Sequence, residues 1–182
     1  MKRAIITPAV LAGTALDELK AWLAVTTPGD DAALAALLRT ALETCEGFTG
    51  AMPLAQLCEE IVPASGSWRT LGTRPVQAVT WVEGIPVAGA RFTIPVADYA
   101  VDLDADGGAR FRLVRSGEAE RVAVRFTAGL AAGWSDLPES VRHGALRLAA
   151  HHYRQRESDT AQAMPPAAIA ALWRPWRRVR VA

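Results

Sequence analysis

Residues 137–157, LPESVRHGALRLAAHHYRQRE, constrain the fold of this chain more than any other segment. Pro138 suits the first turn of a helix, Glu139 adds a negative charge near the positive end of the helix dipole, and either Ser135 or Asp136 could cap the helix. The spacing of the apolar positions predicts one buried face on a helix of about five turns. These positions are Val141, Ala145, Leu148, Ala149, His152 and Tyr153.

Four arginines of this segment fall mostly on other sides of the predicted helix. They are Arg142, Arg147, Arg154 and Arg156. One interpretation is a helix that packs on its own domain with one face and offers an arginine-lined face to a partner. The simpler interpretation is an ordinary amphipathic helix whose basic face is solvated.

Residues 14–50 predict an antiparallel pair of helices. Thr14 and Asp17 suggest a capping box for the first helix, either Asp30 or Asp31 could cap the second, and Gly47 is expected to end it. The apolar positions of the second helix match helical periodicity throughout. They are Leu34, Leu37, Leu38, Ala41, Leu42 and Cys45. Two helices cannot bury both apolar faces against each other alone, so the pair needs the later helix.

Residues 52–128 change from helical periodicity to alternation and become richer in Val, Thr, Phe, Gly and Pro. Residues 1–13 are expected to be extended or loosely attached. The candidate strands are residues 57–62, 67–71, 76–82, 92–94, 99–103, 110–114 and 121–126. A DADGG turn at 104–108 joins two of them. The pattern predicts a small antiparallel sheet inserted between the helical pair and the long helix.

Residues 165–182 predict a short helix followed by a basic arm. This region interleaves tryptophans with arginines, namely Trp173, Arg174, Trp176, Arg177, Arg178 and Arg180. Tryptophan and arginine are frequent in the energetic centres of protein interfaces, and arginine also binds the phosphate backbone of nucleic acids. A protein partner, a nucleic acid and a merely solubilising terminus therefore all remain open.

The residues offer no catalytic, cofactor or metal site. The acidic DLDADG segment at 102–107 begins like a calcium loop, but Leu113 occupies the position that needs a bidentate carboxylate. His143, His151 and His152 lack the spacing of three or four that a shared metal requires on one helix. Neither a glycine-rich phosphate loop nor a nucleophile elbow is present. The absence of these motifs does not exclude an enzyme, but it leaves no candidate catalytic residue.

Bulk properties narrow the function classes further. The chain has 182 residues and a formal net charge of +1, which argues against a protein that coats nucleic acid over its whole surface. Of the two cysteines, Cys45 falls on an apolar helix face and predicts a buried thiol. No apolar run reaches the length of a membrane span. The start of the chain imitates a signal peptide but is broken by Pro8, so we expect synthesis in the cytoplasm.

Three segments in this order resemble the head–tail connector, or adaptor, proteins of long-tailed phages and of the gene transfer agents derived from them. Residues 16–50, which carry LDELKAWLAV and DDAALAALLRTALETCEGFTG, are similar to the opening helix pair of that family. Residues 137–157 are similar to its late helix with a His-Tyr pair, and residues 165–181 are similar to its ending, a short helix followed by a Pro-aromatic-Arg turn. The similarity covers nearly the whole chain, although the middle sheet matches only in kind.

The resemblance implies a structural virion protein, not an enzyme, that is made in the bacterial cytoplasm. Such adaptors form a homo-oligomeric ring, usually of twelve copies, beneath the portal protein. They extend the channel through which DNA passes without sequence-specific binding, and they receive a tail-side stopper or terminator protein. The portal contact would be residues 173–181, and the helices would form the ring body and its subunit contacts.

Taken together, the sequence predicts a single α+β connector domain over residues 1–182. Its parts are a helical pair at 14–50, an inserted sheet region at 52–128, a long helix at 136–157, and a short helix with a basic arm at 165–182. About three main helices and the short C-terminal helix would form a small antiparallel bundle. The alternative function is nucleic-acid binding through the Trp/Arg tail.

Overall fold

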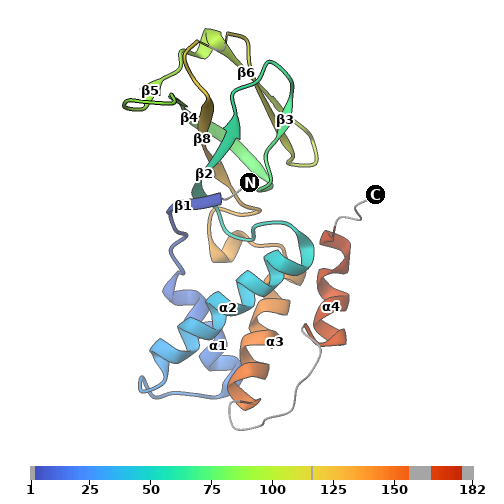
Figure 1. The fold of residues 1–182 in the computed structure, drawn as a ribbon. Coiled ribbons are helices and arrows are strands. Elements are labelled where there is room, and N and C mark those ends of the chain that lie inside the picture. The colour runs from blue at the N-terminus through green and yellow to red at the C-terminus, as the bar shows by residue number, and fades with distance from the viewer. Residues whose placement is uncertain (1–2, 116, 156–164, 178–182) are drawn as a thin grey trace. The chain divides into compact units, whose positions relative to one another are not determined.

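The computed structural model describes residues 3–115, 117–155 and 165–177 and divides the chain into two compact units. One unit, residues 1–8 and 55–129, is built from strands, and the other, residues 9–54 and 130–182, is helical (Figure 1). The predicted α+β class is confirmed. The sequence predicts one domain with an inserted sheet, whereas the structure has two units, because the inserted segment also recruits the N-terminal strand.

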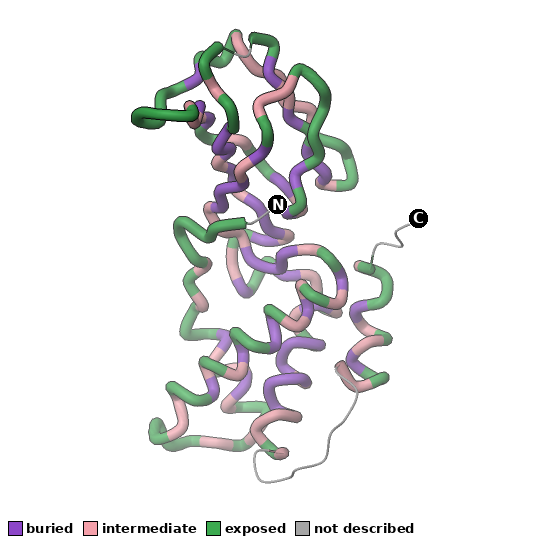
Figure 2. Tube along the Cα trace, viewed as in Figure 1, coloured by how far each residue is buried: buried purple, intermediate pink, exposed green. Residues whose placement is uncertain are grey.

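The helical unit is organised around its third helix. Its described α-helices are α1 (Gly13–Leu23), α2 (Asp31–Thr49), α3 (Glu139–Gln155) and α4 (Ala167–Trp173). Helix α3 contacts each of the other three, and Figure 2 shows it buried along most of its length. Its buried residues are Val141, Gly144, Ala145, Leu146, Leu148, Ala149 and Ala150. The helix therefore buries more than the single face that its periodicity predicts.

Two of the predicted helix ends differ from the structure. Helix α1 begins at Gly13, so Thr14 lies inside its first turn and forms no capping box; its N-cap, Ala12, makes no side-chain capping bond. Helix α2 continues through Gly47 and ends at Gly50, whose φ of 73° is left-handed. Glycine is favoured at such an end because it has no Cβ, and the sequence offers two glycines three residues apart.

Side-chain contacts hold these helices together at their polar ends. The Lys20 ammonium lies 2.6 Å from the Asp31 carboxylate, joining α1 to α2. The Tyr153 hydroxyl donates a hydrogen bond of 2.6 Å to Asp30, joining the end of α3 to the start of α2. Asp30 occupies the N-cap position of α2, but its side chain makes no capping bond there. The acidic turn between α1 and α2 thus acts as a tertiary link.

The strand unit contains two antiparallel sheets where the sequence predicts one. The five-stranded sheet has the order β1-β2-β8-β4-β5 and the three-stranded sheet has the order β3-β7-β6. The strands are β1 (Arg3–Thr7), β2 (Gln56–Pro63), β3 (Arg69–Thr70), β4 (Val76–Ile85), β5 (Phe92–Thr93), β6 (Tyr99–Leu103), β7 (Ala109–Leu113) and β8 (Arg121–Ala128). Alternation locates strands but not their pairing partners, which is why the split into two sheets was not predicted.

The N-terminal segment is a strand rather than a loosely attached end. Strand β1 pairs antiparallel with β2, with Ile5 opposite Cys58 and Arg3 opposite Glu60. All five residues of β1 are exposed, so the strand is held mainly by its backbone pairing. This edge position explains why its sequence shows no clear alternation.

One side of the five-stranded sheet carries a cluster of opposite charges. Arg125 lies opposite Glu59 in the β2–β8 register, with its Nε 2.8 Å from the carboxylate. Arg91 reaches the same carboxylate at 3.0 Å, and both arginines lie 3.5 Å from Glu83. Burial raises the pKa of Glu59, but the hydrogen bonds and positive charges of Arg125 and Arg91 outweigh it and hold that pKa below its usual value. The cluster ties β2, β8 and the β4–β5 hairpin together.

Both cysteines are buried, as predicted for Cys45. Burial raises the pKa of the Cys45 thiol to about 12, although a hydrogen bond with Thr49 partly opposes the shift. Because the thiolate is the reactive form, we expect neither cysteine to react with a disulfide reagent at pH 8 in the folded protein. Absorbance of the released thiolate should show two equivalents only after denaturant is added. Rapid labelling of Cys45 without denaturant would contradict its burial.

Candidate assembly surfaces

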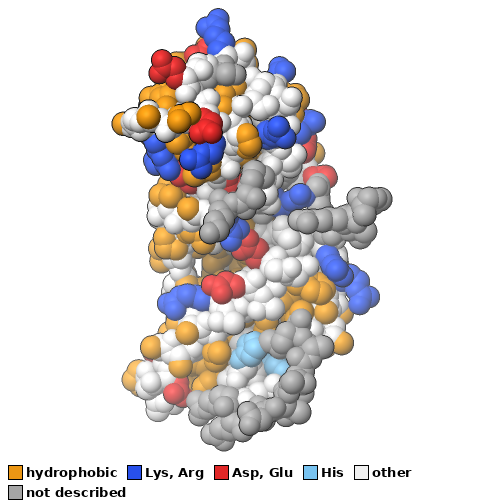
Figure 3. All heavy atoms as spheres, in the orientation of Figure 1, with side chains coloured by type: hydrophobic (Ala, Val, Ile, Leu, Met, Phe, Trp, Pro, Cys, Tyr) orange, Lys and Arg blue, Asp and Glu red, His pale blue; other side chains and the backbone are white. Residues whose placement is uncertain are grey.

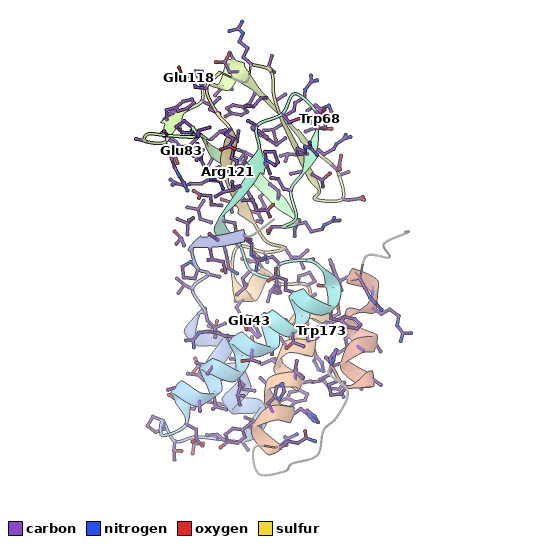
Figure 4. All side chains as sticks on the ribbon, in the orientation of Figure 1. Glu43, Trp68, Glu83, Glu118, Arg121 and Trp173 are labelled. Carbon is purple, nitrogen blue, oxygen red and sulfur yellow. The ribbon has the colours of Figure 1, made fainter. Side chains whose placement is uncertain are left out.

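The C-terminal segment is anchored in the helical core by Trp173. Its side chain is fully buried, and its indole N–H donates a hydrogen bond of 3.3 Å to the carbonyl of Val141 in α3. Its ring also lies 6.2 Å from that of Phe48 in α2. Figure 4 shows Trp173 between α4 and α3. Trp173 is therefore a core residue, and its predicted place in an exposed portal-binding arm is wrong.

The close approach of Trp173 depends on Gly144. A Cβ at that position would lie 2.2 Å from the indole nitrogen of Trp173, well inside any van der Waals contact. The missing side chain therefore creates the space that the indole fills. A glycine within an otherwise good helix was the one signal in the sequence that could have indicated this contact.

The turn after Trp173 is also held against α3 and α2 by side-chain contacts. Trp176, in the 3₁₀ turn η3 (Arg174–Trp176), donates a hydrogen bond of 2.9 Å from its indole N–H to the Ser140 hydroxyl. The Arg177 guanidinium lies 5.4 Å from the centre of the Phe48 ring, within range of a cation–π contact. Arg174 and Arg177 are exposed. Two further predicted arm residues, Arg178 and Arg180, lie outside the described residues.

The predicted arginines of α3 divide into two groups. Arg142 forms ion pairs within its own chain, at 2.9 Å with Glu139 and 3.7 Å with Glu18. Arg147 and Arg154 instead line a surface cavity. Arg156 lies outside the described residues. The structure thus brings Arg147 and Arg154 together and assigns Arg142 to a different, intramolecular role.

This cavity has a volume of about 280 Å³ and lies at the surface of the helical unit. Its lining residues come from α1, from the C-terminal half of α3 and from the start of α4. They are Trp22, Arg147, His151, Arg154, Pro166, Ala168 and Ile169. No carboxylate is among them. Figure 3 shows histidine side chains reaching the surface of this unit beside apolar ones.

Trp22 and His151 line the cavity, and His143 and His152 contact them. Trp22 lies three residues after the buried Leu19 of α1, yet 45% of its surface is exposed and its ring lies edge-on to His143 at 5.3 Å. Burial, followed by the charge of His151, lowers the pKa of His152 below its usual value. The spacing of Arg147, His151 and Arg154 by four and three residues was the signal for this site.

The strand unit presents a second aromatic and basic surface on its three-stranded sheet. Trp68, just before β3, is 40% exposed, and the guanidinium of Arg112 lies 4.7 Å from its ring centre, with that of Arg110 at 5.8 Å. Arg110 also pairs with Asp102. Charges of both signs are interspersed on the face of this unit that Figure 3 shows, so it does not form a single positive field.

Comparisons with known proteins place the chain among virion components. No protein-family model matches it, and no curated protein matches it. Solved structures do match over 100% of this chain and 98% of the matching chain. The neck of an empty gene transfer agent (GTA) particle, computed with C6 symmetry, matches with 30% identity and a TM-score of 0.79. The chain belongs to the family of gene transfer agent neck proteins.

Two further solved structures agree with this family. The virion of a native gene transfer agent particle matches with 29% identity and a TM-score of 0.79. The neck of a native particle, computed with C12 symmetry, matches with 30% identity and a TM-score of 0.77. The neck protein is thus a structural component of the virion particle. The sequence resemblance to connector proteins also implies a structural virion protein.

The described residues of the neck protein contain no group of three His, Cys, Asp or Glu side chains that could hold a metal ion. The acidic turn between β6 and β7 is a hairpin, in which the Asp104 carbonyl accepts a hydrogen bond of 2.9 Å from Gly107. Asp102 and Asp104 both face Arg110, which gives their charges a protein partner. None of the described helices is long and apolar enough to span a membrane.

Proposed function

We propose that this protein is a head–tail connector, which forms a ring between the portal protein and a tail-side stopper or terminator and extends the DNA channel. The observation that carries the proposal is the match over the full chain, at 30% identity, to chains in the necks of gene transfer agent particles. A neck joins the head to the tail components. A protein in it therefore needs one contact toward each side and one toward its own copies.

A ring of twelve copies is the proposed assembly. Necks of related particles were computed with C6 and C12 symmetry, and both are compatible with twelve copies around one axis. Such a ring uses heterologous contacts, in which each copy joins one surface to a different surface of the next. The helical unit offers the cavity beside α3 and the outward side of α2 for such contacts.

The proposed portal contact begins after the residues that anchor the C-terminal segment. Trp173 and Trp176 hold the segment to α3, so the arm available to a partner consists of the exposed Arg174 and Arg177 and the residues that follow. An arm of this kind combines a fixed base with several guanidinium groups, which suits a carboxylate-bearing surface on the partner.

A truncation tests this contact. We expect a chain that ends at Arg177 to keep the fold of the full chain, because the hydrogen bonds of Trp173 and Trp176 remain. Its affinity for purified portal should fall by at least tenfold, since the charge-assisted contacts of Arg178 and Arg180 would be lost. Size-exclusion chromatography with portal, or surface plasmon resonance, measures this loss.

The control is an Arg121→Ala chain of full length. Arg121 is an exposed arginine of β8, outside the arm and outside the proposed ring contacts, so its removal changes the charge without shortening the arm. Circular dichroism should give the same melting temperature for all three chains. If the truncated chain binds portal with wild-type affinity, the proposed contact is wrong, regardless of the affinity of the control chain.

Nucleic-acid binding through the tail is a weaker alternative for this protein. Stacking of bases needs exposed aromatic rings, whereas Trp173 is fully buried and Trp176 is partly buried against α3. The remaining arginines would give an affinity for duplex DNA that falls steeply with salt. In the proposed connector, DNA passes through the channel without sequence-specific binding.

A further inference from the structure

We propose that the cavity beside α3 receives the outward side of α2 from the neighbouring copy, with Glu43 of that copy facing Arg147 and Arg154. The inference rests on the proposed ring and names one contact within it. It joins unlike surfaces of two identical chains. A contact of this kind is what a closed cyclic assembly requires.

The described residues that line the cavity supply positive charge and include no carboxylate. Arg147, His151 and Arg154 follow one another at spacings of four and three residues, so they share one side of α3. Within the described part of the chain, the ion pairs of α3 are made by Arg142, and neither Arg147 nor Arg154 takes part in one. The half-exposed Trp22 adds an apolar wall. An incoming carboxylate would find two guanidinium groups in partly desolvated surroundings.

The outward side of α2 has complementary properties. Glu43 is exposed, and among the described residues it has no ion-pair or hydrogen-bond partner. Figure 4 shows it on α2. Three of its neighbours at helical spacing, Ala36, Thr40 and Gly47, are small and exposed, and the exposed Arg39 lies one turn before it. Small side chains allow another helix to approach closely, so the carboxylate can reach into a shallow cavity.

Two other acidic residues of the helical unit provide the comparison. Asp17 in α1 and Asp136 in η2 (Trp134–Asp136) are exposed and likewise make no ion pair with a described residue. Neither lies on the small-residue surface of α2. A contact that depended only on overall negative charge would use all three acids equally, whereas the proposed contact uses Glu43.

A charge exchange tests the contact in assembled particles. One variant carries Arg147→Glu with Arg154→Glu, and the other carries Glu43→Arg. Each variant alone should reduce the number of tailed particles at least tenfold, because every subunit interface then joins like charges. Co-expression of the two should restore the yield, since each mismatched surface then has a partner of opposite charge. Asp17→Arg, the matched control, should assemble as the wild type does.

A cross-link gives an independent readout. Glu43→Cys combined with Arg154→Cys should yield a ladder of covalent multimers on oxidation of assembled necks, because Cys45 and Cys58 are buried and do not compete. A normal particle yield with Glu43→Arg, or failure of the exchanged pair to restore assembly while wild-type rings form, would overturn the inference. Absence of rings from wild-type necks would instead overturn the proposed connector function.

Discussion

Replacing Gly144 with alanine is expected to destabilise the helical unit by about 2 kcal/mol, although alanine is the better helix former. In an unconstrained helix the change would add about 1 kcal/mol of stability. Here the new Cβ would lie 2.2 Å from the Trp173 nitrogen and 2.8 Å from its Cε2. Overpacking of this kind costs about 1–3 kcal/mol, and partial ejection of a buried tryptophan costs more. Urea unfolding followed by circular dichroism measures the change.

Gly47→Ala in α2 is the matched control for that substitution. Nothing lies within 4 Å of a Cβ at Gly47, so the same chemical change should stabilise the protein by up to about 1 kcal/mol. Hydrogen exchange should also show that Gly144→Ala loosens α4 (Ala167–Trp173), whereas Gly47→Ala leaves it protected. An increase in stability for both variants would show that the indole does not occupy this space in solution.

Replacing Glu60 with alanine should have an effect of similar size in the strand unit. The Glu60 side chain is almost fully buried and accepts hydrogen bonds from the Gly72 and Thr73 amides, both at 2.8 Å. The Thr73 hydroxyl donates a third at 2.6 Å. Removal of the carboxylate would leave these donors without an acceptor in a buried site, at a cost of about 1–3 kcal/mol for each group that water cannot reach. We therefore expect a loss of about 3 kcal/mol.

The measurement again is urea unfolding, with amide exchange of residues 72 and 73 as a local readout. Glu118→Ala is the control, because Glu118 is exposed and its removal should change stability by less than about 0.5 kcal/mol. The loss of stability of Glu60→Gln should lie between those of Glu60→Ala and Glu118→Ala. The glutamine amide keeps one acceptor oxygen, but its N–H group points toward the Gly72 and Thr73 donors. Equal stability of Glu60→Ala and the wild type would mean that the segment after β3 does not depend on this carboxylate.

Two tryptophans of the helical unit have the opposite burial from the one that their spacing indicates. Alternating tryptophan and arginine predicts a binding arm, and Arg174 and Arg177 are exposed. Trp173 does not, because its environment is set by Gly144 on another helix. Conversely, Trp22 follows the apolar spacing of α1 and yet is 45% exposed beside the cavity. Spacing gives the face of a helix, but not whether another helix covers that face.

The sequence by itself determined the elements of this protein: the positions of the helices, most strands and the buried Cys45, because these follow from local periodicity and residue preference. The order of its segments also predicted a structural virion protein, in agreement with its membership of the neck family. Only the tertiary structure decided that the strands form two sheets, that Trp173 is a core anchor and that Arg147 and Arg154 share a cavity. These facts depend on contacts between residues distant in the chain, and local periodicity carries no information about which distant partner a side chain meets.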